Sequence, residues 1–195
     1  SRTRALHPQR PALGFQLLSD PKSRKCELNW TEFHERVTEA ANLFRSLGVG
    51  PGDTVAYLLP NCLETPTVLL AGATAGIVNP INPLLEPEQI ASILRESNAK
   101  VLVTLKAFPK TDVAQKAAEA VAQAPGVTHV IEIDLNRHLR GIKRYIVPLI
   151  RPKVKVTYKA KVLNFEAATS ARKHTALDFD DPKQDRVAAY FHTGL

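Results

Sequence analysis

The sequence predicts an α/β protein in which stacked βαβ units form a mainly parallel sheet flanked by helices. Two observations support this prediction, and both come from the block between Leu47 and Thr104. Short apolar segments alternate there with helical patterns, and Gly, Pro and Asn residues separate them. Parallel strands need a crossover connection, so this alternation is typical of a parallel sheet. The 195 residues of the chain suffice for one sizeable core.

A hairpin and a long helix are expected before this block. Residues 15–18 and 28–30 are predicted to pair as short strands across the loop at 19–25. Thr31 is a suitable N-cap for the helix, because its hydroxyl can accept a hydrogen bond from a free N–H group. Gly48 suits the left-handed residue that follows a helix. The apolar stripe of the helix consists of Phe33, Val37, Ala40, Ala41, Phe44 and Leu47.

Strands and helices then follow in alternation. Strands are predicted at residues 55–59, 77–81, 101–104, 127–133 and 187–192, and helices at 64–76, 87–97 and 111–124. Thr111 is expected to cap the last of these helices. The glycines form neither a G-x-G-x-x-G nor a Walker loop, so the block is interpreted as scaffold.

The order of these motifs resembles the N-terminal domain of the adenylate-forming enzymes, the family of acyl-CoA synthetases, luciferases and peptide-synthetase adenylation domains. The family pattern LGV-x-PGD-x-V, followed by PN, stands here as LGVGPGDTV at residues 47–55 and Pro60-Asn61. A further mark, AG followed by P-x-N-P, stands as AGIVNPINP at residues 75–83. The resemblance covers about residues 8–134 and resumes at the C-terminus. It implies the N-terminal part of an acyl-CoA synthetase that activates a fatty acid.

The same resemblance implies a phosphate-binding loop of the form T-[SG]-G-T-T-G-x-P-K, whose N–H groups and hydroxyls surround the ATP phosphates. Thr193 and Gly194 hold its first two positions and are the only site residues expected here. Leu195 stands where the family has Gly, and the rest of the loop does not follow. No catalytic or metal-binding residue is expected in this chain. ATP, Mg²⁺ and CoA are implied for the complete enzyme, and this chain alone is expected to be an inactive fragment.

The positive charge of the protein belongs to one segment. The net charge is +7, yet nine of the 26 Lys and Arg residues and none of the acidic residues lie between Leu135 and Phe165. Residues 135–161 are therefore predicted to be a basic surface insertion between an α/β part at 1–134 and a return strand at 162–195. A basic amphipathic segment could also contact anionic membranes weakly. Nucleic acid is not an expected partner, since the rest of the protein is slightly acidic.

Other functional patterns are weak. His192, Asp185 and Thr193 could form a triad, but a structural His at the end of a strand is favoured. Cys26 and Cys62 are too few for a disulfide framework, so reduced thiols and a cytoplasmic location are expected. A non-catalytic α/β binding or interaction module stays open as the alternative. A gene that continues past Leu195 with T-T-G-x-P-K would favour the acyl-CoA synthetase over the non-catalytic module.

Overall fold

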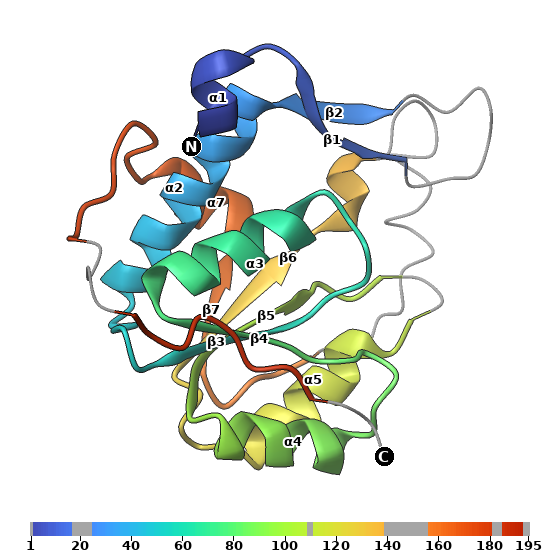
Figure 1. Cartoon of the computed structure of the whole chain (residues 1–195). Coiled ribbons are helices and arrows are strands. Elements are labelled where there is room, and N and C mark those ends of the chain that lie inside the picture. The colour runs from blue at the N-terminus through green and yellow to red at the C-terminus, as the bar shows by residue number, and fades with distance from the viewer. Residues whose placement is uncertain (1, 17–24, 109–110, 139–155, 181–184, 193–195) are drawn as a thin grey trace.

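A central five-stranded sheet with helices on both faces organises the molecule (Figure 1). The structure is a computed structural model that describes residues 2–16, 25–108, 111–138, 156–180 and 185–192. All pairings in this sheet are parallel, which confirms the predicted fold class. The strand order is β4-β3-β5-β6-β7. Its strands are β3 (Thr54–Leu58), β4 (Ile77–Pro80), β5 (Ala99–Leu105), β6 (His129–Ile133) and β7 (Lys161–Asn164).

The helices form a layer on each face of this sheet. Figure 1 shows α2 (Trp30–Ser46), α3 (Glu64–Ala75) and α7 (Phe165–Ser170) on one face. The other face carries α4 (Pro87–Glu96) and α5 (Val113–Ala122). No helix in the described part of the chain is long and apolar enough to cross a membrane.

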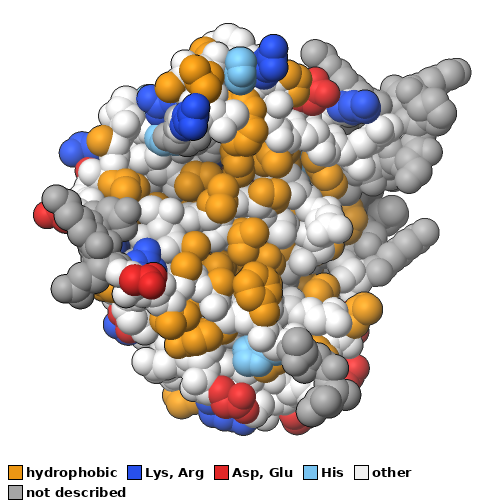
Figure 2. All heavy atoms as spheres, in the orientation of Figure 1, with side chains coloured by type: hydrophobic (Ala, Val, Ile, Leu, Met, Phe, Trp, Pro, Cys, Tyr) orange, Lys and Arg blue, Asp and Glu red, His pale blue; other side chains and the backbone are white. Residues whose placement is uncertain are grey.

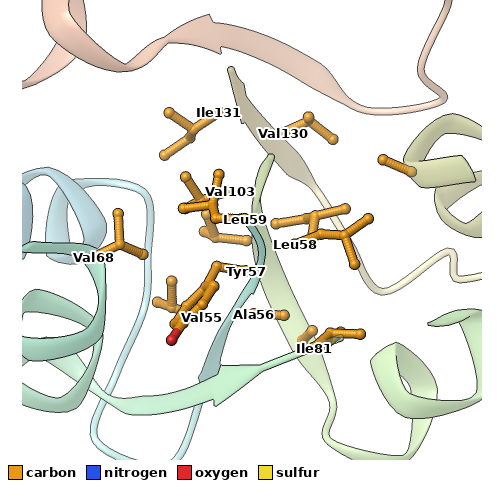
Figure 3. Close-up of a cluster of buried hydrophobic side chains, with 14 of the residues drawn as sticks. Val55, Ala56, Tyr57, Leu58, Leu59, Val68, Ile81, Val103, Val130 and Ile131 are labelled. Carbon is orange, nitrogen blue, oxygen red and sulfur yellow. The ribbon is translucent and has the colours of Figure 1, made fainter. Parts of the chain in front are cut away.

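The core lies between these layers. Every residue of β3 is buried, because helices cover the strand on both sides. Val55 and Leu58 of β3, Val103 of β5 and Ile131 of β6 are all fully buried (Figure 3). Two-sided burial explains why β3 reads as a continuous apolar run rather than as an alternating one.

The turn between α3 and β4 requires glycine. A Cβ atom at Gly76 would lie 2.4 Å from the carbonyl oxygen of Asp53 and 2.7 Å from that of Gly50. Gly48 after α2 has a φ of 85°, as predicted for a helix end. These two glycines therefore serve the scaffold.

The N-terminal region confirms the hairpin but corrects its details. A short helix, α1 (Arg2–Leu6), precedes β1 (Pro11–Phe15), which pairs antiparallel with β2 (Cys26–Asn29). The first strand thus ends at Phe15, the residue at which the sequence pattern predicted that it begins.

The predicted cap of α2 is wrong, because Asn29 and not Thr31 is the N-cap. The Asn29 side chain accepts a hydrogen bond from the Glu32 amide, and the Glu32 carboxylate accepts one from the Asn29 amide. This reciprocal capping box satisfies two free donors at once. Thr31 lies inside the helix, and its hydroxyl donates to the carbonyl of Pro8 at 3.3 Å. For α5 the N-cap is likewise Asp112, although the Thr111 hydroxyl accepts a bond from the Val113 amide.

The C-terminal third holds most of the remaining differences. Neither β7, α7 nor the 3₁₀ helix η1 (Leu135–His138) was predicted. β7 extends the sheet beside β6, with Lys161 opposite His129. The strand expected at residues 187–192 is an extended segment that joins the sheet by a single bridge. Residues 139–155 of the predicted basic insertion lie outside the described residues, so the division at 135 and 161 stays a prediction.

Candidate functional site

An extended segment beside β4 leads the chain toward the carboxyl edge of the sheet. This edge segment, residues 185–192, runs parallel to β4 through a bridge between Val78 and Ala189. The Val78 amide donates to the carbonyl of Ala188 at 3.0 Å, and the Tyr190 amide donates to the carbonyl of Val78 at 2.9 Å. Ligands of open α/β sheets bind outside the carboxyl ends of the strands. The edge segment therefore leads the chain toward the edge of the sheet at which ligands of such folds bind.

Side chains hold both ends of the edge segment. At its start, the Arg186 guanidinium donates to the carbonyl oxygens of Ala73 and Gly76, each at 2.6 Å, and to that of Thr74 at 3.1 Å. At its end, a 3.3 Å hydrogen bond joins His192 Nε2 to the Nδ2 atom of Asn79, which is buried in β4. The segment is thus tied to α3 and to β4.

The two predicted phosphate contacts, Thr193 and Gly194, lie outside the described residues, and their role stays a prediction. The same holds for the Thr193 member of the imagined triad. His192 bonds to Asn79, which is the structural type of contact that the sequence analysis favoured. Sequence reasoning did not single out Arg186, because nothing near it in the chain indicates its partners.

A second group of polar side chains meets inside the protein where α3 begins. Glu64, the first residue of α3, is 1% exposed. His138 Nε2 donates to Glu64 Oε1 at 2.8 Å, and Arg137 Nη1 lies 3.4 Å from the same oxygen. Arg137 also forms an ion pair with Glu166 of α7. This Glu64 cluster joins α3, η1 and α7.

The charges of the Glu64 cluster compensate one another. Burial by itself would raise the pKa of Glu64, but the hydrogen bond from His138 and the charge of Arg137 hold it below its usual value. Burial also lowers the pKa of Arg137, which the charge of Glu64 opposes. A paired carboxylate of this kind stays ionised, so it suits a structural role rather than that of a general acid. Arg137 belongs to the basic segment that was predicted to lie on the surface, and its contact with the buried Glu64 places this side chain partly inside the protein.

The Cys62 thiol and the arrangement of possible metal ligands limit the chemistry of the described residues. Burial raises the pKa of the Cys62 thiol to about 11, so the reactive thiolate form is suppressed. Both cysteines are free thiols. Within the described ranges, no three His, Cys, Asp or Glu side chains are grouped so that they could hold a metal ion.

Apolar side chains gather on the face that carries α3 and the edge segment. Figure 2 shows a stripe of hydrophobic side chains down the middle of this face. Exposed apolar residues on these elements include Leu70, Val187 and Phe191. A groove of about 320 Å³ lies between α2 and α3, lined by Trp30 and Leu70 among others.

The fold is that of the N-terminal part of CoA synthetases. The chain superposes on an acetoacetyl-CoA synthetase from Streptomyces lividans with a TM-score of 0.68 and 24% identity, covering 91% of this chain and 25% of that one. It superposes on the anthranilate CoA ligase AuaEII with a TM-score of 0.62 and 20% identity, covering 90% and 28%. At these identities the two likenesses establish the fold.

The sequence itself establishes the family. Residues 1–193 match the family described as AMP-binding enzyme, and the chain belongs to that family. It is 35% identical over 105 residues to a marinolic acid–CoA ligase of Pseudoalteromonas, covering 54% of this chain and 16% of that protein. It is 31% identical over 134 residues to a long-chain fatty acid–CoA ligase of Escherichia coli O157:H7, covering 66% and 23%. An acetyl-coenzyme A synthetase of Nostoc linckia is 30% identical over 117 residues, covering 57% and 35%. The alignments thus span only a minor part of each relative.

Proposed function

We propose that the protein carrying this sequence is an ATP-dependent fatty acid–CoA ligase, and that these 195 residues supply its N-terminal α/β part. The family match over residues 1–193 carries the proposal. The named relatives act on different acids, and one of them is a long-chain fatty acid–CoA ligase. A fatty acid is therefore the proposed substrate class.

The proposed reaction has two steps. A carboxylate attacks the α-phosphate of ATP, which gives acyl-AMP and releases pyrophosphate. The thiol of CoA then displaces AMP and forms the thioester. In this scheme the edge segment delivers Thr193 and Gly194 to the phosphates, where a hydroxyl and backbone N–H groups offset negative charge. The described residues include no cluster fit to hold Mg²⁺, so no step is assigned to that ion in this part of the protein.

ATP–pyrophosphate exchange by the complete protein tests the proposal. The acids are acetate, octanoate and palmitate, and we expect exchange to be fastest with a fatty acid of medium or long chain. Exchange with acetate alone would contradict the fatty acid class. ATP binding without exchange for any acid would favour the non-catalytic binding module. The 195-residue chain by itself serves as the control and is expected to catalyse no exchange.

Thr193 offers a sharper test of the phosphate contact. In the complete protein, Thr193→Ala removes one hydroxyl next to the expected phosphate position. We expect kcat/KM for ATP to fall about tenfold, the loss produced by one charge-assisted hydrogen bond. Unchanged ATP kinetics in this variant would remove Thr193 from the proposed site.

A cytoplasmic location with little membrane contact is also part of the proposal. Two basic side chains of the segment at 135–161, Arg137 and His138, are engaged by Glu64, which supports an internal rather than a lipid-facing role for its start. Co-sedimentation with phosphatidylglycerol vesicles at low and high salt tests this. Tight binding that falls steeply with salt would contradict it.

A further inference from the structure

Arg186 connects two segments that are far apart in the sequence. Its guanidinium reaches the carbonyl oxygens of Ala73, Thr74 and Gly76, which lie at the C-terminal end of α3. The last carbonyls of a helix lack intrahelical partners and carry partial negative charge. The last turn of α3 has no basic residue of its own. Arg186 therefore supplies from the edge segment the cation that α3 lacks.

The geometry uses the fork shape of the guanidinium. Nη1 donates to Gly76 and Nη2 to Ala73, so the two nitrogens bind carbonyls on both sides of the helix end. Gly76 lies so close to the carbonyls of Asp53 and Gly50 that there is no room for a Cβ. The acceptors thus belong to a tightly packed turn. A planar, bidentate donor bound to such a turn constrains both position and orientation.

The bridge to β4 begins only two residues after this contact. Two backbone hydrogen bonds, at Ala188 and Tyr190, hold the edge segment to Val78. Such a short pairing is weak by itself and leaves the register open to slippage. Arg186 binds α3 two residues ahead of this pairing, and the His192–Asn79 bond lies after it, so these two side chains limit the registers open to the edge segment.

We infer that Arg186 is a positioning residue for the phosphate-binding loop: its clamp on the end of α3 sets the register of the edge segment and hence the point at which the chain enters the loop. The inference rests on the proposed function. Arg186 itself makes no contact with substrate in this inference. Its effect on KM for ATP is transmitted through residues 187–192.

Hydrogen exchange and steady-state kinetics on the complete protein test this inference together. In Arg186→Ala we expect the Tyr190 amide to exchange about tenfold faster, because the lost contacts with α3 no longer oppose local opening of the edge segment. We expect KM for ATP to rise about tenfold by the same reasoning, with KM for the acid unchanged. Arg186→Lys keeps the charge but not the fork, so we expect it to rescue both values only in part.

Two further variants separate positioning from simple stabilisation. Arg186→Ala combined with Thr74→Lys returns a cation to the last turn of α3 without tying it to the edge segment. We expect this pair to restore part of the lost melting temperature, because a cation at a helix end contributes less than the full set of Arg186 bonds, but not KM for ATP. Arg95→Ala is the matched control, because Arg95 Nη1 likewise donates to a backbone carbonyl, that of Gln123 at 3.0 Å, which does not belong to the edge segment. It is expected to change neither the Tyr190 exchange nor KM for ATP.

The outcomes decide between the claims. Recovery of KM in the Arg186→Ala/Thr74→Lys variant, or unchanged exchange at Tyr190 in Arg186→Ala, would overturn the positioning role. Faster exchange at Tyr190 with unchanged KM for ATP in an active protein would overturn it as well. Absence of acid-dependent ATP–pyrophosphate exchange in the wild-type protein would contradict the proposed function. Hydrogen exchange at the Tyr190 amide alone would then test whether Arg186 sets the register.

Discussion

Arg137 and Arg186 bind the two ends of α3 in different ways. Arg137 follows β6 and meets two carboxylates, Glu64 at the start of α3 and Glu166 of α7. Arg186 lies beside β4 and meets only backbone carbonyls, among them those at the end of α3. The first arrangement depends on the ionisation of its partners, whereas the second depends on a helix dipole that does not titrate. The stability contributed by the Arg137 contacts should therefore depend on pH, whereas that contributed by the Arg186 contacts should not.

The largest effect is expected from Glu64→Gln. This change leaves Arg137 and His138 without the buried charge that both face, and breaking a buried pair costs about 3–5 kcal/mol. We expect a loss at the lower end of that range, because Glu166 still pairs with Arg137. Urea unfolding at pH 7 measures it. Glu88→Gln, in the first turn of α4 but exposed, is the control for the helix dipole alone, and it should cost well below 1 kcal/mol.

The pH dependence of stability provides the second test of the contrast. The pKa of Glu64 is lower in the folded protein than its ordinary value of 4.5, so its ionised form stabilises the fold above that pH. This contribution disappears as the pH falls below 4.5 and through the folded pKa. We expect the difference in unfolding free energy between wild type and Glu64→Gln to shrink over that acid range. A difference that stays constant down to pH 3 would contradict the assignment of the Glu64 cluster.

The predicted effect at Arg186 is smaller and has a different signature. Arg186→Ala should cost about 2 kcal/mol, since its charge-assisted bonds to partly buried carbonyls are only partly replaced by bonds to water. The loss should be the same at pH 5 and at pH 8, because neither the guanidinium nor its acceptors titrate in that interval. Urea unfolding at the two pH values measures it. A loss that changed by more than about 1 kcal/mol between them would mean that Arg186 has an ionisable partner.

The elements of the fold differ in how well the sequence predicts them. The apolar run of β3 and the stripe of α2 could be predicted because their patterns are local and repeat at the period of the element. The cap of α2 could have been found, since Asn29 and Glu32 have the spacing of a capping box. β7 could not, because it is four residues long, follows a basic run and is mostly exposed. Its pairing with β6 decides its structure.

The candidate site was less accessible to sequence reasoning than the fold. Thr193 and Gly194 were predicted through the resemblance and lie outside the described residues. Arg186 meets the end of α3 from 110 and more positions away, and Glu64 meets His138 across 74 positions. No local pattern encodes such contacts, since each exists only after the sheet has formed. Polar residues whose partners are remote are therefore the ones that the sequence leaves unassigned.

The smallest effect is expected at Asp53, the charged residue of the PGD motif that helped to identify the family. Its carboxylate accepts bonds from the Gly50 amide at 2.7 Å and from Lys100 Nζ at 2.8 Å. The Asp53 and Lys100 side chains are 21% and 38% exposed, so water and salt screen the pair. Burial opposes ionisation of Asp53, yet these bonds hold its pKa below the ordinary value. We expect Asp53→Asn to cost about 1 kcal/mol or less, and the cost should fall further in 1 M salt. Urea unfolding with and without salt measures both values. A loss as large as that of Glu64→Gln would reverse the comparison, because it would place the main ionic anchor in the family motif rather than in contacts that only the fold creates.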